Sequence, residues 1–226
     1  MQEIVPHVFT FSNLRVGRVY LLTEGDGLTL IDASMASSGK AILTQLESAG
    51  HALNAVKRIL ITHAHPDHVG AVVTLQKATG ARLIVPDGER AVIDGEVPIP
   101  RAATFLKPPQ TLLKGMKADQ TLQDGDVLQE VWGGLQAIST PGHAPGHMAY
   151  WQPQRRILFC GDVIFNVPRK MRLPLAFLTY DMAENIRSIA RLVPLEPEVI
   201  CFGHGRPVTA NAAQFLRDFA KKVGAI

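Results

Sequence analysis

One stretch of the sequence decides the fold and reads Ile59-Leu60-Ile61-Thr62-His63-Ala64-His65-Pro66-Asp67-His68-Val69-Gly70. Its apolar start, Ile59 to Ile61, predicts a buried strand. Alternate residues of an extended chain share one face, so we expect His63 and His65 to point the same way at the end of this strand. These two imidazoles are the first of two predicted groups of polar side chains.

The second group follows a proline. Pro66 disfavours helix at His65 and suits the first turn of a helix that begins next. Asp67 and His68 therefore lie at the opening of that helix and point elsewhere than the first pair. Imidazole and carboxylate groups are ligands of zinc and its first-row neighbours, so the stretch predicts two adjacent sets of metal ligands. The alternative is a polar loop in which the histidines occur by chance. That explanation would be reasonable for a single histidine, but four metal-competent side chains within six residues argue against it.

These residues resemble the signature of a known family. The run His63-Ala64-His65-Pro66-Asp67-His68 matches the HxHxDH motif of the metallo-β-lactamase superfamily. Three further motifs, Thr140-Pro141-Gly142-His143, Gly161-Asp162 and Gly203-His204-Gly205, resemble those of its glyoxalase II and lactonase branch. The resemblance covers nearly the whole chain and implies an α/β fold, the four-layer αββα sandwich of that superfamily.

The pattern of predicted elements agrees with this fold. Apolar runs, turn glycines and helical periodicity predict strands at 8–11, 19–23, 28–32, 82–85, 127–132, 135–139, 149–152, 157–160 and 198–202, and helices at 38–49, 69–78, 183–192 and 210–223. Strands are followed by helices in each half of the chain, which suits two sheets packed face to face with helices outside. We expect Asp181 to cap the helix at 183–192.

Residues 94–118 interrupt this pattern. Four prolines exclude regular structure, yet the segment is rich in apolar residues. A long irregular segment in a compact domain is usually functional or mobile. We interpret it as an insert in a single domain of residues 1–226 that either walls a substrate cleft or forms the subunit contact of a homodimer. A loop merely attached to the core is the alternative.

The composition is that of a globular protein and excludes several classes. The chain has 226 residues, of which 46% are hydrophobic and 19% charged, and its net charge is +3. That length suits one well-buried domain. No run of Lys or Arg exceeds two residues, so no nucleic-acid partner is expected. No apolar run approaches the length of a membrane span, so no membrane partner is expected either.

The cysteines and the first residues favour a cytoplasmic protein. Cys160 and Cys201 form no CxxC pattern, so a disulfide framework is not expected. Residues 1–6 lack a basic region followed by an apolar core, so no signal peptide is predicted. The resulting expectation is a reducing cytoplasm.

The resemblance extends the two ligand sets to residues that follow later strands. The implied ligands of a first metal are His63, His65 and His143. The implied ligands of a second metal are Asp67, His68 and His204, and Asp162 bridges the two metals. The implied cofactor is a pair of zinc ions, with iron or manganese as alternatives, because ligand type separates these metals poorly.

Several other residues are candidates for supporting roles. Asp32 ends a strand; it could cap the next helix, or support the metal site as an aspartate does in the resembled family, and both could hold together. We interpret His147 as a structural histidine that is hydrogen-bonded beside the site. Cys160 is expected to be buried on its strand rather than to bind metal. His7 and His51 are interpreted as ordinary surface or turn histidines.

The resemblance implies a metal-dependent hydrolase. Two divalent cations, two carboxylates and a bridging hydroxide leave a net positive centre, which suits a transition state that gains negative charge. Paired metals would lower the pKa of the bridging water, and the hydroxide would attack the ester, thioester or lactone carbonyl of a small acyl substrate. Asp67 is the catalytic candidate, because it could orient the hydroxide and later carry a proton.

Departures from the patterns of individual branches of the family narrow the range of candidate activities. Asp162 occupies the bridging position, where zinc β-lactamases usually lack an aspartate, so a true β-lactamase is disfavoured. Glyoxalase II carries an appended helical domain, whereas only one helix is predicted after His204. Acyl-homoserine lactonases place a catalytic tyrosine shortly after the bridging aspartate, where this chain has Val163-Ile164-Phe165, and Tyr180 is only a distant substitute.

Two other activities remain as alternatives on the same centre. One is a phosphodiesterase or nuclease, although the RNA-binding arm of the tRNA-processing nucleases is not seen in this sequence. The other is a mononuclear-iron enzyme that resembles the persulfide dioxygenases. The flavodiiron branch has a glutamate at the second histidine of the motif and a fused flavin domain, so His65 and the chain length argue against it.

A basic and apolar stretch lies on both sides of Asp162. Its cations are Arg155, Arg156, Arg169, Lys170 and Arg172, and its apolar residues include Phe165, Leu173, Leu175, Phe177 and Leu178. The stretch could bind an amphipathic anion such as an acyl thioester. A solvated loop of snorkelling side chains is the alternative.

Overall fold

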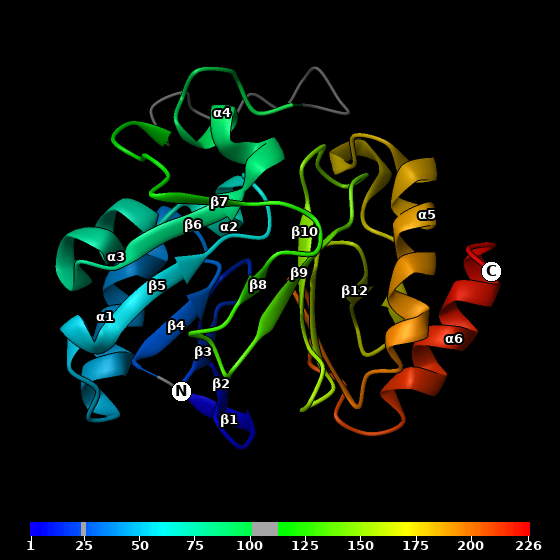
Figure 1. Ribbon diagram of the computed structural model, residues 1–226, viewed down its shortest axis with the longest axis horizontal. Helices are drawn as coiled ribbons and strands as arrows, with labels where there is room; N and C mark the ends of the chain where they lie inside the picture. Colours follow the sequence, from blue (N-terminus) through cyan, green and yellow to red (C-terminus); the bar gives the residue numbers. More distant parts are fainter. Residues whose placement is uncertain (24–25, 101–112) are drawn as a thin grey trace.

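Two β-sheets pack face to face in the computed structural model, and helices cover the outer surface of each sheet (Figure 1). The structure describes residues 1–23, 26–100 and 113–226. This arrangement of four layers is the αββα sandwich that the sequence predicts.

The first sheet has seven strands, which pair in the order of the sequence. They are β1 (Gln2–Val5), β2 (Val8–Thr10), β3 (Tyr20–Leu22), β4 (Leu28–Ile31), β5 (Val56–Leu60), β6 (Arg82–Pro86) and β7 (Gln120–Leu122). The first four strands are antiparallel, whereas β4 to β7 run parallel. Parallel neighbours need crossover connections, and α1 (Gly39–Ser48) and α3 (Val72–Thr79) supply two of them.

The second sheet has five strands in the order β14-β11-β10-β9-β8. Their bounds are β8 (Val127–Leu128), β9 (Leu135–Ser139), β10 (Met148–Gln152), β11 (Ile157–Gly161) and β14 (Val199–Phe202). The β11 and β14 strands are parallel, and the other neighbours are antiparallel. The α5 (Met182–Leu192) and α6 (Ala212–Val223) helices cover the outer face of this sheet (Figure 1).

Short elements complete the fold. A small hairpin pairs β12 (Phe165–Asn166) with β13 (Met171–Arg172). The remaining helices of the described residues are short: α2 (Pro66–Val69), α4 (Arg90–Ile93), η1 (Ala36–Ser38), η2 (Leu53–Ala55), η3 (Asp87–Glu89), η5 (Ala176–Leu178) and η6 (Val193–Leu195). Within the described ranges, no helix combines the length and apolar character needed to cross a bilayer.

Alternating side chains along each central strand fill two different cores. Leu30 of β4 and Ile59 of β5 pack toward the helices, whereas the next residues, Ile31 and Leu60, pack between the two sheets. Successive side chains of a strand point to opposite faces, and a parallel strand covered on both faces is therefore apolar throughout. Each fully buried Leu or Ile side chain contributes about 1.5–3 kcal/mol relative to an exposed one.

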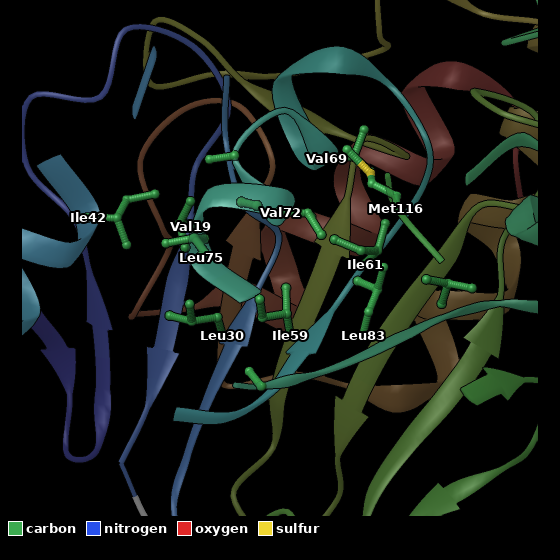
Figure 2. Close-up of a cluster of buried hydrophobic side chains, with 14 of the residues drawn as sticks. Val19, Leu30, Ile42, Ile59, Ile61, Val69, Val72, Leu75, Leu83 and Met116 are labelled. Carbon is green, nitrogen blue, oxygen red and sulfur yellow. The ribbon is translucent and has the colours of Figure 1, made fainter. Parts of the chain in front are cut away.

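Figure 2 shows the core on the helical side of the first sheet. Ile42 of α1 and Leu75 of α3 project onto the sheet, where they meet Leu30, Ile59 and Leu83. A third core lies between the second sheet and the α5 and α6 helices. These contacts hold both sheets in place, so the loops at the ends of their strands start from fixed points.

The structure differs from the predicted elements at several places. The strand predicted at 127–132 ends at Leu128, because residues 129–133 form turns in which Trp132 has a φ of 53°. Neither β1 nor β7 was predicted. The N-cap predicted at Asp181 is confirmed, since its Oδ1 accepts a hydrogen bond from the backbone N–H of Glu184 at 2.9 Å. About half of the insert predicted at 94–118, residues 101–112, lies outside the described residues.

Candidate metal centre

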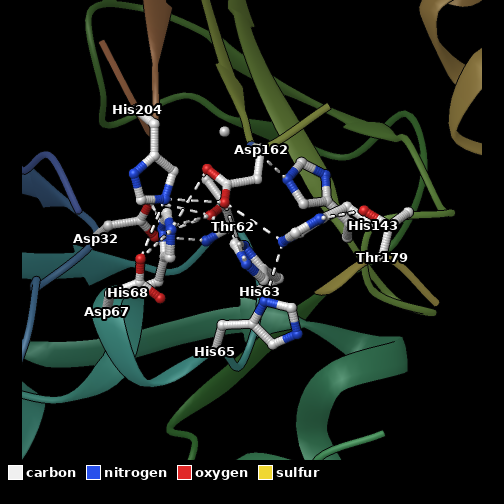
Figure 3. A network of polar contacts seen from close by, with 12 residues as sticks. Asp32, Thr62, His63, His65, Asp67, His68, His143, Asp162, Thr179 and His204 are labelled. Carbon is white, nitrogen blue, oxygen red and sulfur yellow. Dashed lines mark hydrogen bonds and ion pairs between the residues drawn. The ribbon is translucent and has the colours of Figure 1, made fainter. Parts of the chain in front are cut away.

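The polar side chains that the sequence singles out follow strands whose carboxyl ends lie at one edge of the sandwich. His63 follows β5 in the first sheet, and Asp162 and His204 follow the parallel strands β11 and β14 in the second. His143 lies in the loop that leaves β9. Parallel strands bring their carboxyl ends to the same edge, which is the usual place for a site in α/β folds. Figure 3 shows the side chains converging there from both sheets.

His63, His65 and His143 form one group. Their ligand-type nitrogen atoms all lie within 4.8 Å of one another, and His65 Nδ1 is 3.0 Å from His143 Nε2. The ring centroids of His63 and His65 are 4.5 Å apart, as expected for alternate residues that share one face. The structure therefore brings together the three histidines assigned to the first metal.

Hydroxyl groups hold two of these rings in place. Thr62 Oγ1 donates to the carboxylate of Asp32, so its lone pairs can accept from His63 Nδ1 at 3.0 Å. Thr179 Oγ1 donates to a backbone carbonyl and lies 3.2 Å from His143 Nδ1. Because Nδ1 of each ring has a protein partner, Nε2 is the nitrogen left to face the centre.

A second group comprises Asp67, His68 and His204, whose ligand-type atoms also lie within 4.8 Å of one another. His204 Nε2 is 3.1 Å from Asp67 Oδ2. The short helix α2 begins at Pro66, so Asp67 and His68 project from its first turn, as the sequence predicts. These are the three residues assigned to the second metal.

Asp162 lies between the two groups. Its Oδ2 is 3.3 Å from His143 Nε2 in the first group and 3.2 Å from His204 Nε2 in the second. Its Oδ1 is 3.4 Å from His68 Nε2. Asp162 therefore contacts histidines of both groups.

Asp32 supports the second group. Its Oδ2 is 2.8 Å from His68 Nδ1, and its Oδ1 accepts from the backbone N–H of Thr62 at 2.8 Å. The alternative role as a helix cap is wrong, because neither η1 nor α1 has a side-chain hydrogen bond at its N-cap. A carboxylate on Nδ1 fixes the tautomer of the imidazole and leaves Nε2 free to bind metal.

Among the described residues, none provides a hydrogen-bond partner for three buried atoms of this cluster. They are His63 Nε2, His68 Nε2 and Asp162 Oδ1. Buried polar atoms in native proteins are nearly always paired, and each unpaired one costs about 1–3 kcal/mol. All three are good metal ligands, so the donor set fits bound divalent cations.

The electrostatics of the two groups differ. Burial lowers the pKa of His63 well below its usual value and that of His143 to about 3. Burial also lowers the pKa of His204, but Asp162 and Asp67 outweigh it and raise the pKa to about 9. The first group is therefore neutral and ready to bind a cation, whereas a cation at His204 would displace a proton.

The neighbouring residues have structural roles. His147 is buried; its Nε2 accepts from the backbone N–H of Asp162 at 3.0 Å, and its Nδ1 is 2.8 Å from Thr140 Oγ1, as predicted for a structural histidine. A Cβ atom on Gly203 would lie 2.0 Å from Asp162 Oδ1, so only glycine allows this approach. Cys160 is a buried free thiol, also as predicted. His51 lies outside both groups.

The sequence analysis did not identify Thr62 and Thr179. Thr62 directly precedes the HxHxDH run, so its position at a strand end was a usable signal. Thr179 is 36 residues from its partner His143, and no local pattern connects the two.

Comparisons with known proteins agree with this geometry. The family model described as the metallo-beta-lactamase superfamily matches residues 13–204. The probable metallo-hydrolase YflN of Bacillus subtilis (strain 168) is 27% identical over 97% of this chain and 91% of its own length. A hydroxyacylglutathione hydrolase of Methylococcus capsulatus is 31% identical over 81% of this chain, which spans only 60% of that relative.

A solved structure has the same fold. A metallo-beta-lactamase family protein from Thermus thermophilus superimposes with a TM-score of 0.75 at 24% identity, over 99% of this chain and 81% of that one. The match of the family model spans most of the chain and includes every residue of the two ligand groups. The chain therefore belongs to the metallo-β-lactamase superfamily and is a metal-binding hydrolase of that family.

Proposed function

We propose that the chain hydrolyses carboxylic esters, thioesters or lactones with two divalent cations, most readily zinc, held at this centre. The observation that carries the proposal is the pair of ligand groups with Asp162 in contact with both, and with buried ligand atoms that lack hydrogen-bond partners among the described residues. When bound, paired cations polarise a carbonyl oxygen and lower the pKa of a coordinated water. One cation would be held by His63, His65 and His143. The other would be held by Asp67, His68 and His204, and Asp162 would contribute to both sites.

Asp67 is the residue proposed to handle protons. Its side chain is 20% exposed, whereas that of Asp162 is 3% exposed, so Asp67 is the carboxylate that substrate and water can reach. Burial raises its pKa, but His68 and His204 outweigh burial and lower the pKa below its usual value. Asp67 is thus ionised at neutral pH, the state in which it orients a nucleophile by accepting a hydrogen bond.

Space for an anionic acyl substrate supports the choice of substrate class. A cavity of about 620 Å³ reaches His204 and is lined in part by Arg15, Arg18 and Arg206. Arg206 also lines a second cavity of about 490 Å³, together with Arg169, Lys170 and Lys222. Aryl and alkyl side chains are exposed along 175–180, including Phe177 at 48%. Cations and apolar surface together suit an amphipathic anion.

The hydroxyacylglutathione hydrolase relative makes thioesters the first class to test. The Phe165 ring lies 4.5 Å from His204, between centroids, and belongs to the Val163-Ile164-Phe165 stretch, in which this chain lacks the tyrosine expected of a lactonase. Phenylalanine has no proton to give, so a lactonase would need another donor. Tyr180 is 57% exposed, and its backbone N–H donates to the His143 carbonyl at 3.1 Å.

The test combines metal analysis with a substrate panel. Metal content of the native protein would be measured by inductively coupled plasma mass spectrometry, and turnover would be measured on esters, thioesters, lactones and a phosphodiester. We expect about two zinc ions per chain and turnover of acyl substrates. His63→Ala and Asp162→Ala should abolish turnover, whereas His51→Ala, a histidine outside the cluster, should leave it intact.

Other results would redirect the assignment. Faster cleavage of bis(p-nitrophenyl) phosphate than of thioesters would favour a phosphodiesterase. One iron per chain, no hydrolysis and oxygen consumption with a persulfide would favour a sulfur dioxygenase. Hydrolysis confined to β-lactams would contradict the role proposed for Asp162.

A further inference from the structure

Glu89 is a buried carboxylate that the metal centre described so far does not use. It ends η3, directly after β6, and only 1% of its surface is exposed. Its Oε2 accepts a hydrogen bond from the backbone N–H of Ala64 at 2.9 Å, and its Oε1 accepts one from the backbone N–H of Gly146 at 2.7 Å. Each oxygen of the carboxylate therefore holds a different segment of the chain.

The two segments are the ones that carry the first ligand group. Ala64 lies between His63 and His65, and Gly146 lies three residues after His143 in the loop between β9 and β10. Glu89 thus connects the His63–His65 segment to the His143 loop. Within the described part of the chain, it makes no hydrogen bond to Asp67, His68 or His204. Its hydrogen bonds therefore hold the segments of the first ligand group and not those of the second.

Close backbone contact accompanies this connection. A Cβ atom on Gly146 would lie 2.4 Å from the carbonyl carbon of Gly88, and a Cβ atom on Gly88 would lie 2.9 Å from the Cα atom of Gly146. Both glycines are therefore needed for the His143 loop to lie directly against η3. That approach brings the Gly146 N–H within reach of the Glu89 carboxylate.

We propose that Glu89 is a positioning residue that sets the distance between the His63–His65 segment and His143 and thereby determines the affinity of the first metal site. Glu89 itself touches neither metal nor substrate. The inference rests on the proposed metal-dependent function. Metal affinity depends on how well ligands are held before binding, and partners of ligand segments typically change it by about 10–100-fold.

Glu89→Gln is the sharpest perturbation. Glutamine has nearly the same shape, but its amide nitrogen cannot accept a hydrogen bond, so only one of the two N–H groups keeps a partner. Asp94→Asn is the matched control, because Asp94 lies at the other end of α4 and its Oδ1 accepts from the backbone N–H of Ala118 at 2.8 Å. Asp94 thus holds a backbone amide in the same region, and that amide belongs to no ligand segment.

The first measurement is a zinc titration of metal-free protein against a competing chelator, which resolves two binding steps. Glu89→Gln should weaken one step by about 10–100-fold and leave the other within about twofold. Asp94→Asn should leave both steps unchanged. Equal weakening of both steps by Glu89→Gln, or no weakening, would overturn the proposal.

The second measurement is hydrogen exchange at the Ala64 and Gly146 amides of the metal-free protein. Glu89→Gln should speed exchange at one or both of these amides. Unchanged exchange would refute the proposal that Glu89 joins the two segments, whatever the zinc titration shows. Glu89→Asp, one methylene shorter, serves if the glutamine variant does not fold. If wild-type protein binds no zinc, the proposed function fails, and the exchange data still decide whether Glu89 joins the two segments.

Discussion

Replacing Asp32 by asparagine would test how far the centre depends on residues outside the ligand set. Asp32 has a φ of 61°, and asparagine tolerates this left-handed conformation as well as aspartate does. The substitution therefore changes the side-chain chemistry without adding backbone strain. The asparagine oxygen can still accept from Thr62 N–H, but its amide nitrogen would face His68 Nδ1, which lies 2.8 Å from Oδ2 in the native protein.

The expected magnitude follows from these contacts. Asp32 is 2% exposed, so each hydrogen bond to its charge contributes about 1.5–3 kcal/mol. One such bond is lost in the variant and a second one weakens, so the metal-free protein should lose about 2–4 kcal/mol of unfolding free energy. A donor opposite Nδ1 also favours the tautomer of His68 that carries its proton on Nε2. Zinc affinity at the second group should then fall about 10–100-fold.

Two assays measure these effects separately. Urea unfolding of chelator-treated protein gives the stability change, and a chelator-competition titration gives the zinc affinity of each step. Asp119→Asn is a control, because Asp119 accepts from the backbone N–H of Leu83 at 2.7 Å, and neither residue belongs to a ligand group. If Asp32→Asn kept native stability and both zinc affinities, the role assigned to the Asp32–His68 contact would be wrong.

Three further outcomes are expected. Tyr150→Phe removes a buried hydroxyl that donates to the Ile61 carbonyl at 2.7 Å, and should cost about 1–3 kcal/mol in urea unfolding; an unchanged midpoint would contradict this bond. Chelation of metal should lower the melting temperature, since zinc at about a thousand times its dissociation constant adds about 4 kcal/mol; scanning calorimetry measures it. Replacing Arg169 and Arg172 together by alanine should raise KM for an anionic acyl substrate but not for a neutral ester. If the variant and the native protein had the same KM for the anionic substrate, the basic stretch would not bind substrate.

The four ligand residues of the HxHxDH run could be predicted from local sequence, whereas His143, Asp162 and His204 were assigned through the resemblance to the metallo-β-lactamase superfamily. Local spacing carries the information: His63 and His65 alternate along an extended chain, and Pro66 starts the helix that turns Asp67 away. None of this requires knowledge of the tertiary structure. The same local signals failed at 127–132, where apolar residues such as Trp132 are buried in a turn against the inter-sheet core rather than in a strand.

The long-range contacts of the supporting residues could not be predicted from local patterns, although the resemblance indicated the role of Asp32. Glu89 joins segments that are 25 and 57 residues away, and Asp32 reaches His68 across 36 residues. Such pairs come together only because the strands that precede them are neighbours or face each other in the folded chain. Nothing in the sequence near Glu89 distinguishes it from a surface glutamate, and its burial follows from tertiary packing alone.

The chemistry of the centre makes metal binding part of the stability of the fold. His63 Nε2, His68 Nε2 and Asp162 Oδ1 lack hydrogen-bond partners among the described residues, although the last two lie 3.4 Å apart as an ion pair. A buried polar atom without a hydrogen bond costs about 1–3 kcal/mol, which is a sizeable share of the stability of a typical domain, about 5–15 kcal/mol. Thr62, Thr179 and Asp32 prevent the rings from turning to find other partners, because they already occupy the Nδ1 atoms of His63, His143 and His68. These contacts stabilise the fold and also keep ligand atoms facing the centre without hydrogen-bond partners, so metal loading and folding should be coupled.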